Sequence, residues 1–283
     1  MASLQRSARE WENNAQSNAL WAVLTDNRKK AQSWDEGEFF ATGREEVRIV
    51  MRRLQQLGLA QSAGGCFLDF GCGVGRVTRA LMEYFADGTG IDVSQTMIDR
   101  AREYAAADPH QARYIVNAHG DLGMVISGSI DFVYSHIVLQ HIPASCQRKF
   151  IGEFLRILKP GGVAAFQIPT ANLEGAWSRR LRRAKKILHR VMPESAIVSV
   201  KRAFGKDAST AMVSMDMNIC SEEAISAIVD RNRCVLLDAP FTNSTDKSHR
   251  GKIRFMDRNE ARVEILKGMT DSPYLSQFFF IRK

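Results

Sequence analysis

Short apolar runs alternate with helical patterns through the middle of this 283-residue chain. The apolar runs are brief and mostly lack polar alternation, as strands buried on both faces do. The runs that predict strands are 66–71, 88–93, 113–117, 130–137 and 163–169, and the helical patterns between them are 76–85, 94–106 and 144–162. Ser94 is expected to cap the second helix, and Pro160-Gly161-Gly162 to end the third. This alternation predicts a parallel sheet covered on both faces.

The regions on either side of this alternation carry further helical and strand patterns. Residues 1–40 show an irregular apolar face, whereas 42–59 show a regular one, with Thr42 and Glu45 spaced as a capping box. The alternation stops over 170–218. The elements expected after that break are a Ser221-capped helix and strands over 233–241 and 276–283.

Composition narrows the class of protein. Hydrophobic residues make up 45% of the chain and charged residues 25%, which is ordinary for a globular protein. No run approaches about 18 uncharged apolar residues, so a transmembrane helix is not expected, and the polar N-terminus lacks the apolar core of a signal peptide. The five cysteines are scattered without a metal-ligand spacing, which indicates reduced thiols in a cytoplasmic protein and no metal site.

A glycine-rich loop follows the first predicted strand. It reads Gly71-Cys72-Gly73-Val74-Gly75, with Asp69 two positions before the first glycine. A dinucleotide fingerprint would require another glycine where Arg76 stands. A pyrophosphate also avoids a nearby carboxylate, whereas Asp69 suits a ligand that carries an ammonium group. Asp92, at the tip of the second strand, is placed to accept hydrogen bonds from ribose hydroxyls. Together these residues indicate an adenosine-type cofactor with a cationic tail.

Four motifs in order resemble those of the class I S-adenosylmethionine-dependent methyltransferases that act on small molecules. They are FLDFGCGVGRVTRAL, GIDVSQTMIDRAR, SGSIDFVYSHIVLQHIP and FLRILKPGGVAAFQIP, and they cover residues 66–169. The resemblance implies S-adenosyl-L-methionine as the cofactor. It also implies a doubly wound, mostly parallel, seven-stranded Rossmann-like sheet with an N-terminal helical cap and a helical insertion. EFFATGREEV resembles the lead-in of a subgroup in which that cap closes over the cofactor.

The resemblance also implies roles for single residues at the cofactor site. Asp69, Gly71 and Gly73, with Gly75 completing the loop, would face the methionine end of the cofactor. Asp92 would bind both ribose hydroxyls. The adenine contacts would come from Val93 and Met97. The acidic residue that often follows the third strand in the family is absent, so Asn117, the backbone near Ala118 and His119, or Asp121 must serve instead.

His136 and His141 lie near the end of the fourth strand, where open α/β sheets place their active sites. An acceptor oxygen or nitrogen must lose a proton during methyl transfer, and imidazole is suited to take it. His141 is therefore either a base or acceptor ligand, or a structural residue that bonds the backbone. His136 has the same alternatives, and its backbone could contact the cofactor instead.

The positive charge of the chain is concentrated in one segment. The net charge is +8, and residues 171–206 contain ten basic and two acidic side chains. Within it, 177–191 forms one apolar stripe with arginines and lysines elsewhere, as a solvated helix docked on the sheet would. The alternatives are a lid or docking surface for an anionic acceptor, or for a membrane surface. Nucleic acid is a weaker candidate, because no binding motif accompanies the charge.

We therefore expect transfer of a methyl group to oxygen or nitrogen of a small or medium-sized acceptor, an anionic one if the basic segment contacts it. A nicotinamide-dependent oxidoreductase and a catalytically silent cofactor-binding protein are the alternatives. The oligomeric state stays open. The expected organisation is an N-terminal helical cap over 1–45, a cofactor-binding core over 46–169, a basic insertion or lid over 170–220 and a C-terminal completion of the sheet over 221–283.

Overall fold

A computed structural model describes seven stretches of the chain: 2–24, 34–59, 64–109, 111–174, 217–243, 253–267 and 272–283. The chain divides into two compact units, one made of Met1–Asn172 with Asp216–Lys283 and the other of Leu173–Met215. Nearly all described residues belong to the first unit. The basic segment and the helix expected over 177–191 lie outside the described residues. No helix within these stretches is long and apolar enough to cross a membrane.

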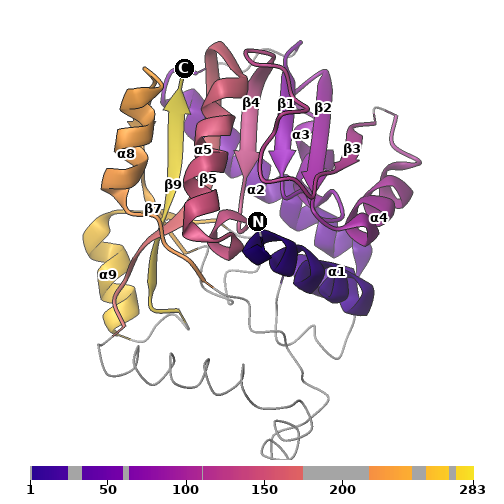
Figure 1. The fold of residues 1–283 in the computed structure, drawn as a ribbon, viewed down its shortest axis with the longest axis horizontal. Coiled ribbons are helices and arrows are strands. Elements are labelled where there is room, and N and C mark those ends of the chain that lie inside the picture. Colours follow the sequence, from indigo (N-terminus) through magenta and orange to yellow (C-terminus); the bar gives the residue numbers. More distant parts are fainter. Residues whose placement is uncertain are drawn as a thin grey trace, which may run out of the picture. The chain divides into compact units, whose positions relative to one another are not determined.

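One nine-stranded sheet organises the first unit (Figure 1). Its order is β3-β2-β1-β4-β5-β9-β7-β8, and β6 pairs with β9 beside β7. The parallel half consists of β3 (Arg113–Val116), β2 (Asp87–Asp92), β1 (Cys66–Phe70), β4 (Ile130–Ser135) and β5 (Leu158–Asn172). The antiparallel half consists of β9 (Tyr274–Arg282), β6 (Val235–Asp238), β7 (Phe241–Thr242) and β8 (Phe255–Met256). The predicted doubly wound, mostly parallel sheet is confirmed, with short additional strands at one end.

One of the two additional strands has a local cause. The strand expected over 233–241 divides into β6 and β7, because Pro240 lies between them and has no backbone N–H to donate. Both pieces still pair with β9, and the carbonyl of Pro240 accepts from the N–H of Phe278 at 2.9 Å. The sequence pattern did not predict β8.

Helices cover both faces of the sheet. In Figure 1, α5 (Ala144–Ile157) and α8 (Glu222–Arg231) lie in front of it, and α2 (Glu36–Gln56) and α3 (Arg76–Leu81) lie behind. Successive residues of a strand point to opposite faces of the sheet. In β1, Leu68 packs with α5 and α8, and Phe67 packs with α2 and α3. The other helices of the described stretches are α1 (Ala2–Val23), α4 (Gln95–Ala105) and α9 (Arg258–Leu266), and η2 (Leu139–His141) is a 3₁₀ helix of one turn.

The predicted start of α2 was wrong. Asp35 caps this helix by accepting from the N–H of Glu38 at 2.8 Å, and Thr42 lies inside it, with its hydroxyl donating to the carbonyl of Phe39. The helix extends upstream because Phe39 and Phe40 are buried there. Asp35 and Glu38 have capping-box spacing themselves, so the true start carried a sequence signal that was overlooked.

Other predicted helix boundaries are partly confirmed. Ser94 and Ser221 cap α4 and α8, since their hydroxyls accept from the N–H groups of Met97 and Ala224. In contrast, α5 ends at Ile157, before Pro160-Gly161-Gly162. Leu158 already pairs with β4, and the proline–glycine turn forms an irregularity inside β5, so the strand begins earlier than expected.

Helices α2 and α3 approach closely at Gly43. A Cβ atom on Gly43 would lie 2.2 Å from the carbonyl oxygen of Arg76, a distance that no real side chain tolerates. A glycine in the middle of a helix usually lowers stability. At position 43 glycine is required because a larger residue would clash with the backbone of Arg76. The close approach brings the next turn of α2 against Arg76 and the end of β4.

We expect Gly43→Ala to lower the free energy of unfolding by about 1–3 kcal/mol, because backbone must move to admit the methyl group. Gly152→Ala in α5 is the matched control, since its Cβ would meet nothing within 4 Å. That substitution should raise stability by roughly 0.5–1 kcal/mol through helix propensity alone. Urea unfolding of the two variants measures both changes. A Gly43→Ala protein as stable as Gly152→Ala would refute the close contact.

Candidate functional site

The glycine loop connects β1 to α3 at the carboxyl edge of the parallel strands. Its three glycines have positive φ angles of 78°, 53° and 83°, a region that other residues rarely adopt. The N–H groups of Gly71 and Cys72 both donate to the carbonyl of Ile91 in β2, which ties the loop to the neighbouring strand. A Cβ on Gly71 would lie 2.3 Å from Val138, so the chain after β4 also presses on this loop.

Asp92 ends β2 and holds the loop from the other side. Its carboxylate accepts from the N–H of Gly73 and from the N–H of Ser94, each at 2.9 Å. Burial raises the pKa of Asp92 above its ordinary value, although these backbone donors work in the opposite direction. An ionised carboxylate has about four acceptor positions, so its two oxygens retain capacity for two hydroxyl donors. The carboxylate is thus fixed beside the loop, in a residue that is partly exposed as a whole.

Asp69 lies in β1 directly before the loop and is only 3% exposed. The hydroxyl of Thr78 donates to it at 2.6 Å. Burial, together with the negative charge of Glu46, raises the pKa of Asp69 to about 7 against the effect of that hydrogen bond. A nearby cation would reverse this balance, because an opposite charge favours the ionised form.

Helix α1 crosses the same edge of the sheet (Figure 1). Glu12 accepts from the hydroxyls of Ser94 at 2.6 Å and of Thr96 at 2.5 Å, next to Asp92. Trp11 contacts the ring of His141 edge-on at 5.2 Å between centroids. A Cβ on Gly73 would lie 2.7 Å from Val23. The helix therefore touches the chain after β1, after β2 and after β4, and Glu12 was not foreseen from the sequence.

The residues predicted to contact adenine lie near Asp92 but differ in their exposure to solvent. Val93 directly follows Asp92 and is partly exposed, whereas Met97 is buried in the first turn of α4 beside Phe40 and Val74. Asn117 is buried, and its side chain organises its own loop: the amide donates to the carbonyl of Asp121 and the oxygen accepts from the N–H of His119. Its backbone N–H donates to the carbonyl of Asp92.

His136 follows β4 and contacts a buried carboxylate. Its Nδ1 lies 2.8 Å from Oε1 of Glu46, a residue of α2 with no exposed surface. Glu46 also accepts from the hydroxyl of Tyr134 at 2.6 Å and from the guanidinium of Arg76 at 2.7 Å. Burial opposes ionisation of Glu46, but Arg76 and His136 outweigh it and hold its pKa well below the ordinary value.

Glu46 was missed in the sequence, although a signal was present. It lies four and eight residues before Val50 and Leu54, on the apolar stripe of α2. A charged residue on such a stripe must find a buried partner.

His141 is half-buried at the end of η2 and belongs to another set of contacts. Its Nε2 lies 3.1 Å from the amide nitrogen of Gln140. The oxygen of Gln140 accepts from the amide of Gln167, whose own oxygen accepts from the N–H of Ile137. Gln167 also contacts Ser276 in β9. Both predicted histidines therefore stand at the end of β4, each held by a different network.

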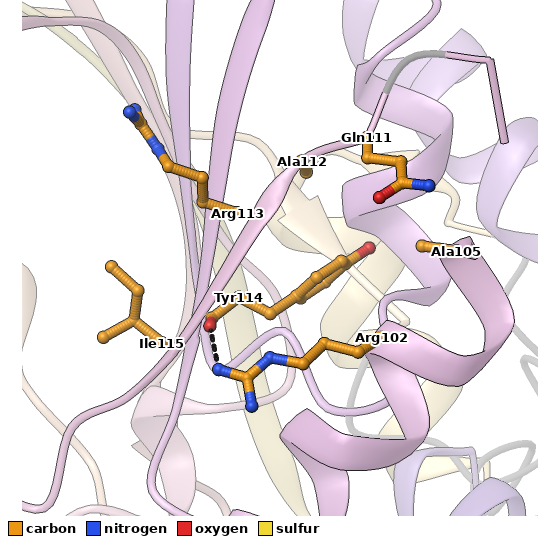
Figure 2. A pocket seen from close by; sticks show the side chains of 7 residues that line it. All are labelled: Arg102, Ala105, Gln111, Ala112, Arg113, Tyr114 and Ile115. Atoms are coloured by element: carbon orange, nitrogen blue, oxygen red, sulfur yellow. Dashed lines mark hydrogen bonds between the residues drawn. The ribbon is translucent and has the colours of Figure 1, made fainter.

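A separate pocket of about 410 Å³ lies between α4 and the edge strand β3 (Figure 2). Arg102, Arg113 and the exposed Ile115 line it, and Arg102 donates to the carbonyl of Tyr114 at 2.7 Å. None of the residues predicted for the site borders this pocket. Across the described stretches no group of three or more histidine, cysteine or acidic side chains is placed to hold a metal ion.

Known proteins resemble the region that carries this site. Residues 68–166 match the family described as "Methyltransferase domain". A trans-aconitate 2-methyltransferase of Azoarcus sp. is 29% identical over 168 residues, which are 55% of this chain and 62% of that protein. A malonyl-[acyl-carrier protein] O-methyltransferase of Pectobacterium atrosepticum is 34% identical over 116 residues, or 40% and 43% of the two chains. The chain thus spans less than two thirds of these relatives.

A solved structure shares the fold. Magnesium protoporphyrin IX methyltransferase from Synechocystis, crystallised with bound S-adenosylhomocysteine, superposes with a TM-score of 0.50 and 16% identity, covering 86% of this chain and 84% of that one. The sheet order, the glycine loop and the matched family agree with the four sequence motifs. Residues 68–166 therefore match a methyltransferase domain in sequence, and the chain shares the fold of this solved methyltransferase.

Proposed function

We propose that this protein transfers a methyl group from S-adenosylmethionine to an oxygen or nitrogen atom of a small or medium-sized acceptor. The observation that carries the proposal is the placement of two buried or half-buried carboxylates, Asp69 and Asp92, on either side of a glycine loop at the carboxyl edge of the sheet. Open α/β sheets bind their ligands at this edge. The family of the domain makes methyl transfer the reaction that this arrangement would serve.

The residues at this edge fit the cofactor chemically. Asp92 would accept the ribose hydroxyls through the acceptor positions that Gly73 and Ser94 leave open. Asp69 would face the ammonium group, and Gly71, Gly73 and Gly75 would let the backbone approach the methionine part. Val93 and Met97 would pack on the adenine. The side chain of Asn117 shapes its loop, so that loop's backbone is the better candidate for a polar adenine contact.

When bound, the cofactor supplies a methyl group already activated on a sulfonium. The chain then has to align an acceptor atom with that methyl group, exclude water and receive a proton from acceptors that carry one. Helix α1 supports the second task, since Trp11, Glu12 and Val23 contact three of the loops at this edge. We accordingly propose the segment 1–45 as a cap over the core.

An anionic acceptor fits the distribution of charge. The ten basic residues of 171–206 follow β5, the strand next to β4. The relatives are named for trans-aconitate and for malonyl-[acyl-carrier protein], and both compounds carry carboxylates. We propose a carboxylate- or phosphate-bearing acceptor of this general kind, drawn by long-range attraction.

A nicotinamide cofactor fits the same edge less well. The third glycine of the fingerprint is replaced by Arg76, whose guanidinium is buried and paired with Glu46. It therefore points into the core instead of leaving space for a pyrophosphate. Asp69 would also repel phosphate charge.

Calorimetry is expected to show binding of S-adenosylmethionine and S-adenosylhomocysteine and no binding of NADH. Asp92→Ala should weaken cofactor binding by about 2–3 kcal/mol, because hydrogen bonds from two hydroxyls to a carboxylate are lost. Asp99→Ala is the matched control, since Asp99 is an exposed carboxylate of α4. Failure of the unaltered protein to bind either sulfur compound would end the proposal, and undiminished affinity in Asp92→Ala would remove that residue from the site.

Cofactor binding should release protons near neutral pH. The pKa of Asp69 is about 7 without ligand, and an adjacent ammonium group must lower it. Below pH 7 affinity should therefore rise with pH, by up to about tenfold per unit. Calorimetry in two buffers of different ionisation enthalpy counts the protons between pH 6 and 7. Asp69→Asn should abolish this component, whereas Asp87→Asn, at the exposed amino end of β2, should retain it. Equal proton release in both variants would contradict the role of Asp69.

The anionic acceptor can be tested through salt dependence, once labelled methyl transfer into cell-extract metabolites has identified an acceptor. Neutralising four arginines outside the described residues should raise the acceptor KM and flatten its dependence on ionic strength, because surface attraction is screened within about 10 Å at 0.1 M salt. These are Arg179, Arg180, Arg182 and Arg183. The control removes the same charge from exposed positions on the core, Arg52, Arg100, Arg231 and Arg262. If the acceptor KM depended on ionic strength in the same way in all three proteins, the proposal of an anionic acceptor would be refuted.

A further inference from the structure

The turn after β4 has a backbone conformation that its sequence does not favour. Ile137, between His136 and Val138, has a φ of 57°. A β-branched residue rarely adopts this left-handed conformation, which persists only where the surroundings impose it. Strained residues of this kind cluster at active sites and ligand-binding sites. The contacts of Ile137 and its neighbours therefore indicate what the strain serves.

Gln167 of β5 imposes the conformation. Its side chain is fully buried, and its oxygen accepts from the N–H of Ile137 at 3.0 Å. Its nitrogen donates to the side-chain oxygen of Gln140 at 3.1 Å and to the hydroxyl of Ser276 in β9. A backbone N–H can only donate, so the amide must turn its oxygen toward Ile137. Partners on η2 and β9 thus fix the oxygen of Gln167 at the place where the turn needs an acceptor.

The strained turn contacts the start of the glycine loop. A Cβ atom on Gly71 would lie 2.3 Å from Val138, so the side chain of Val138 lies directly against the Cα atom of Gly71. The hydroxyl of Ser135 donates to the carbonyl of Phe70 at 3.0 Å and ties the end of β4 to the same loop. On its other side, the N–H of Gly71 donates to the carbonyl of Ile91. The first glycine is therefore held between β2 and the turn after β4.

The turn also contacts the N-terminal cap. The side chain of Ile137 packs against an apolar cluster that includes Ala15 and Ala22 of α1 and Val74 of the glycine loop. A single turn thus meets both parts of the chain that would enclose the cofactor, the loop and the cap. A change in the conformation of Ile137 would alter both contacts together.

We infer that Gln167 is a positioning residue of the cofactor site: its hydrogen bond to Ile137 holds the turn after β4 in the conformation that places Val138 against Gly71. The inference rests on the proposed function, because it takes the glycine loop as the binding site of S-adenosylmethionine. Gln167 acts on the cofactor through the turn, and its own side chain stays in the core.

Loss of the amide should weaken cofactor binding. Once no acceptor faces Ile137, the strained turn spends part of its time in relaxed conformations, and affinity falls by the fraction of molecules that keep the binding conformation. Gln167→Met conserves the side-chain volume and removes the amide. Calorimetry should show binding of S-adenosylhomocysteine weakened at least about fivefold.

Gln277→Met is the matched control. Gln277 is a buried glutamine of β9 whose amide oxygen accepts from Thr170 and whose nitrogen donates to the carbonyl of Ala239. This variant loses the same kind of hydrogen bonds in the same sheet, and its affinity should stay within about twofold of the unaltered protein. Undiminished affinity in Gln167→Met, or an equal loss in both variants, would overturn the inference.

Glycine at position 137 supplies a readout that a purely structural role of Gln167 would not produce. Glycine adopts positive φ angles without steric cost, so a turn with Ile137→Gly no longer depends on the bond from Gln167. Adding Ile137→Gly to Gln167→Met should therefore raise the affinity for S-adenosylhomocysteine at least about threefold. If Gln167 only filled space in the core, removal of a second side chain would leave the affinity unchanged or lower it.

Arg233→Gly is the control for this rescue. Arg233 also has a positive φ, of 55°, but it lies between α8 and β6. In the Gln167→Met background it should restore no affinity. A Gln167→Met protein that Ile137→Gly does not improve, or that Arg233→Gly improves equally, would contradict the positioning role.

The turn can also be observed in the unaltered protein without ligand. A positive φ brings the amide hydrogen of Ile137 close to its own α hydrogen, which gives a strong NMR cross-peak between them. A bonded amide also exchanges slowly with solvent. We expect both signs in the unaltered protein, and exchange of Ile137 at least about tenfold faster in Gln167→Met. A missing cross-peak or rapid exchange in the unaltered protein would overturn the inference even if Gln167→Met did not fold.

These measurements separate the inference from the proposed function. Failure of the unaltered protein to bind S-adenosylmethionine and S-adenosylhomocysteine would refute the proposed function, and the cofactor role of Gln167 with it. Binding by the unaltered protein without the expected loss in Gln167→Met would refute the inference alone.

Discussion

The buried carboxylate of Glu46 is the constraint around which one side of this site is arranged. Removing such a charge from water costs several kcal/mol, which only close and well-oriented partners offset. Arg76, Tyr134 and His136 provide them from α3 and from the end of β4. The partners reach Glu46 only because α2 approaches α3 closely, and Gly43 permits that approach. A helix that precedes the core in sequence is thereby tied to the start of α3 and to the end of β4.

A second constraint comes from the parallel half of the sheet. The carboxyl ends of β1, β2 and β4 meet at one edge, so the segments that follow them must share that space. The carboxylate of Asp92 accepts hydrogen bonds from the N–H groups of Gly73 and Ser94. These bonds join the loop after β1 to the N-cap of α4. Glu12 extends the same network to α1 through Ser94 and Thr96. The loops are therefore held by hydrogen bonds among themselves before any ligand contributes.

The charges at this edge also act on one another. Asp69 lies near Glu46 and Asp92, and burial together with these like charges raises its pKa to about 7. Glu46 remains ionised because Arg76 neutralises it. The candidate site thus contains two different carboxylates: Glu46 is paired with the cation Arg76, and Asp69 would be ionised fully by a cationic ligand. That asymmetry suits a ligand with an ammonium group.

The sequence by itself determined the features that depend on local chemistry and on periodic patterns. The alternation of apolar runs with amphipathic helices specified the parallel sheet. Gly71, Gly73 and Gly75 specified the turn, because few other residues adopt positive φ angles. Ser94 and Ser221 specified two helix starts, because a hydroxyl cap bonds only three residues away.

Contacts between residues far apart in the chain were decided by the tertiary structure alone. Glu46 and His136 are 90 residues apart, and Glu12 and Thr96 are 84 apart. Nothing in a local pattern says which buried carboxylate will face which ring. The irregular start of β5 and the division of β6 from β7 depend in the same way on pairing with neighbouring strands. The sequence therefore indicated the edge of the sheet at which the candidate site lies, and packing decided which side chains meet there, because only folding brings their donors and acceptors together.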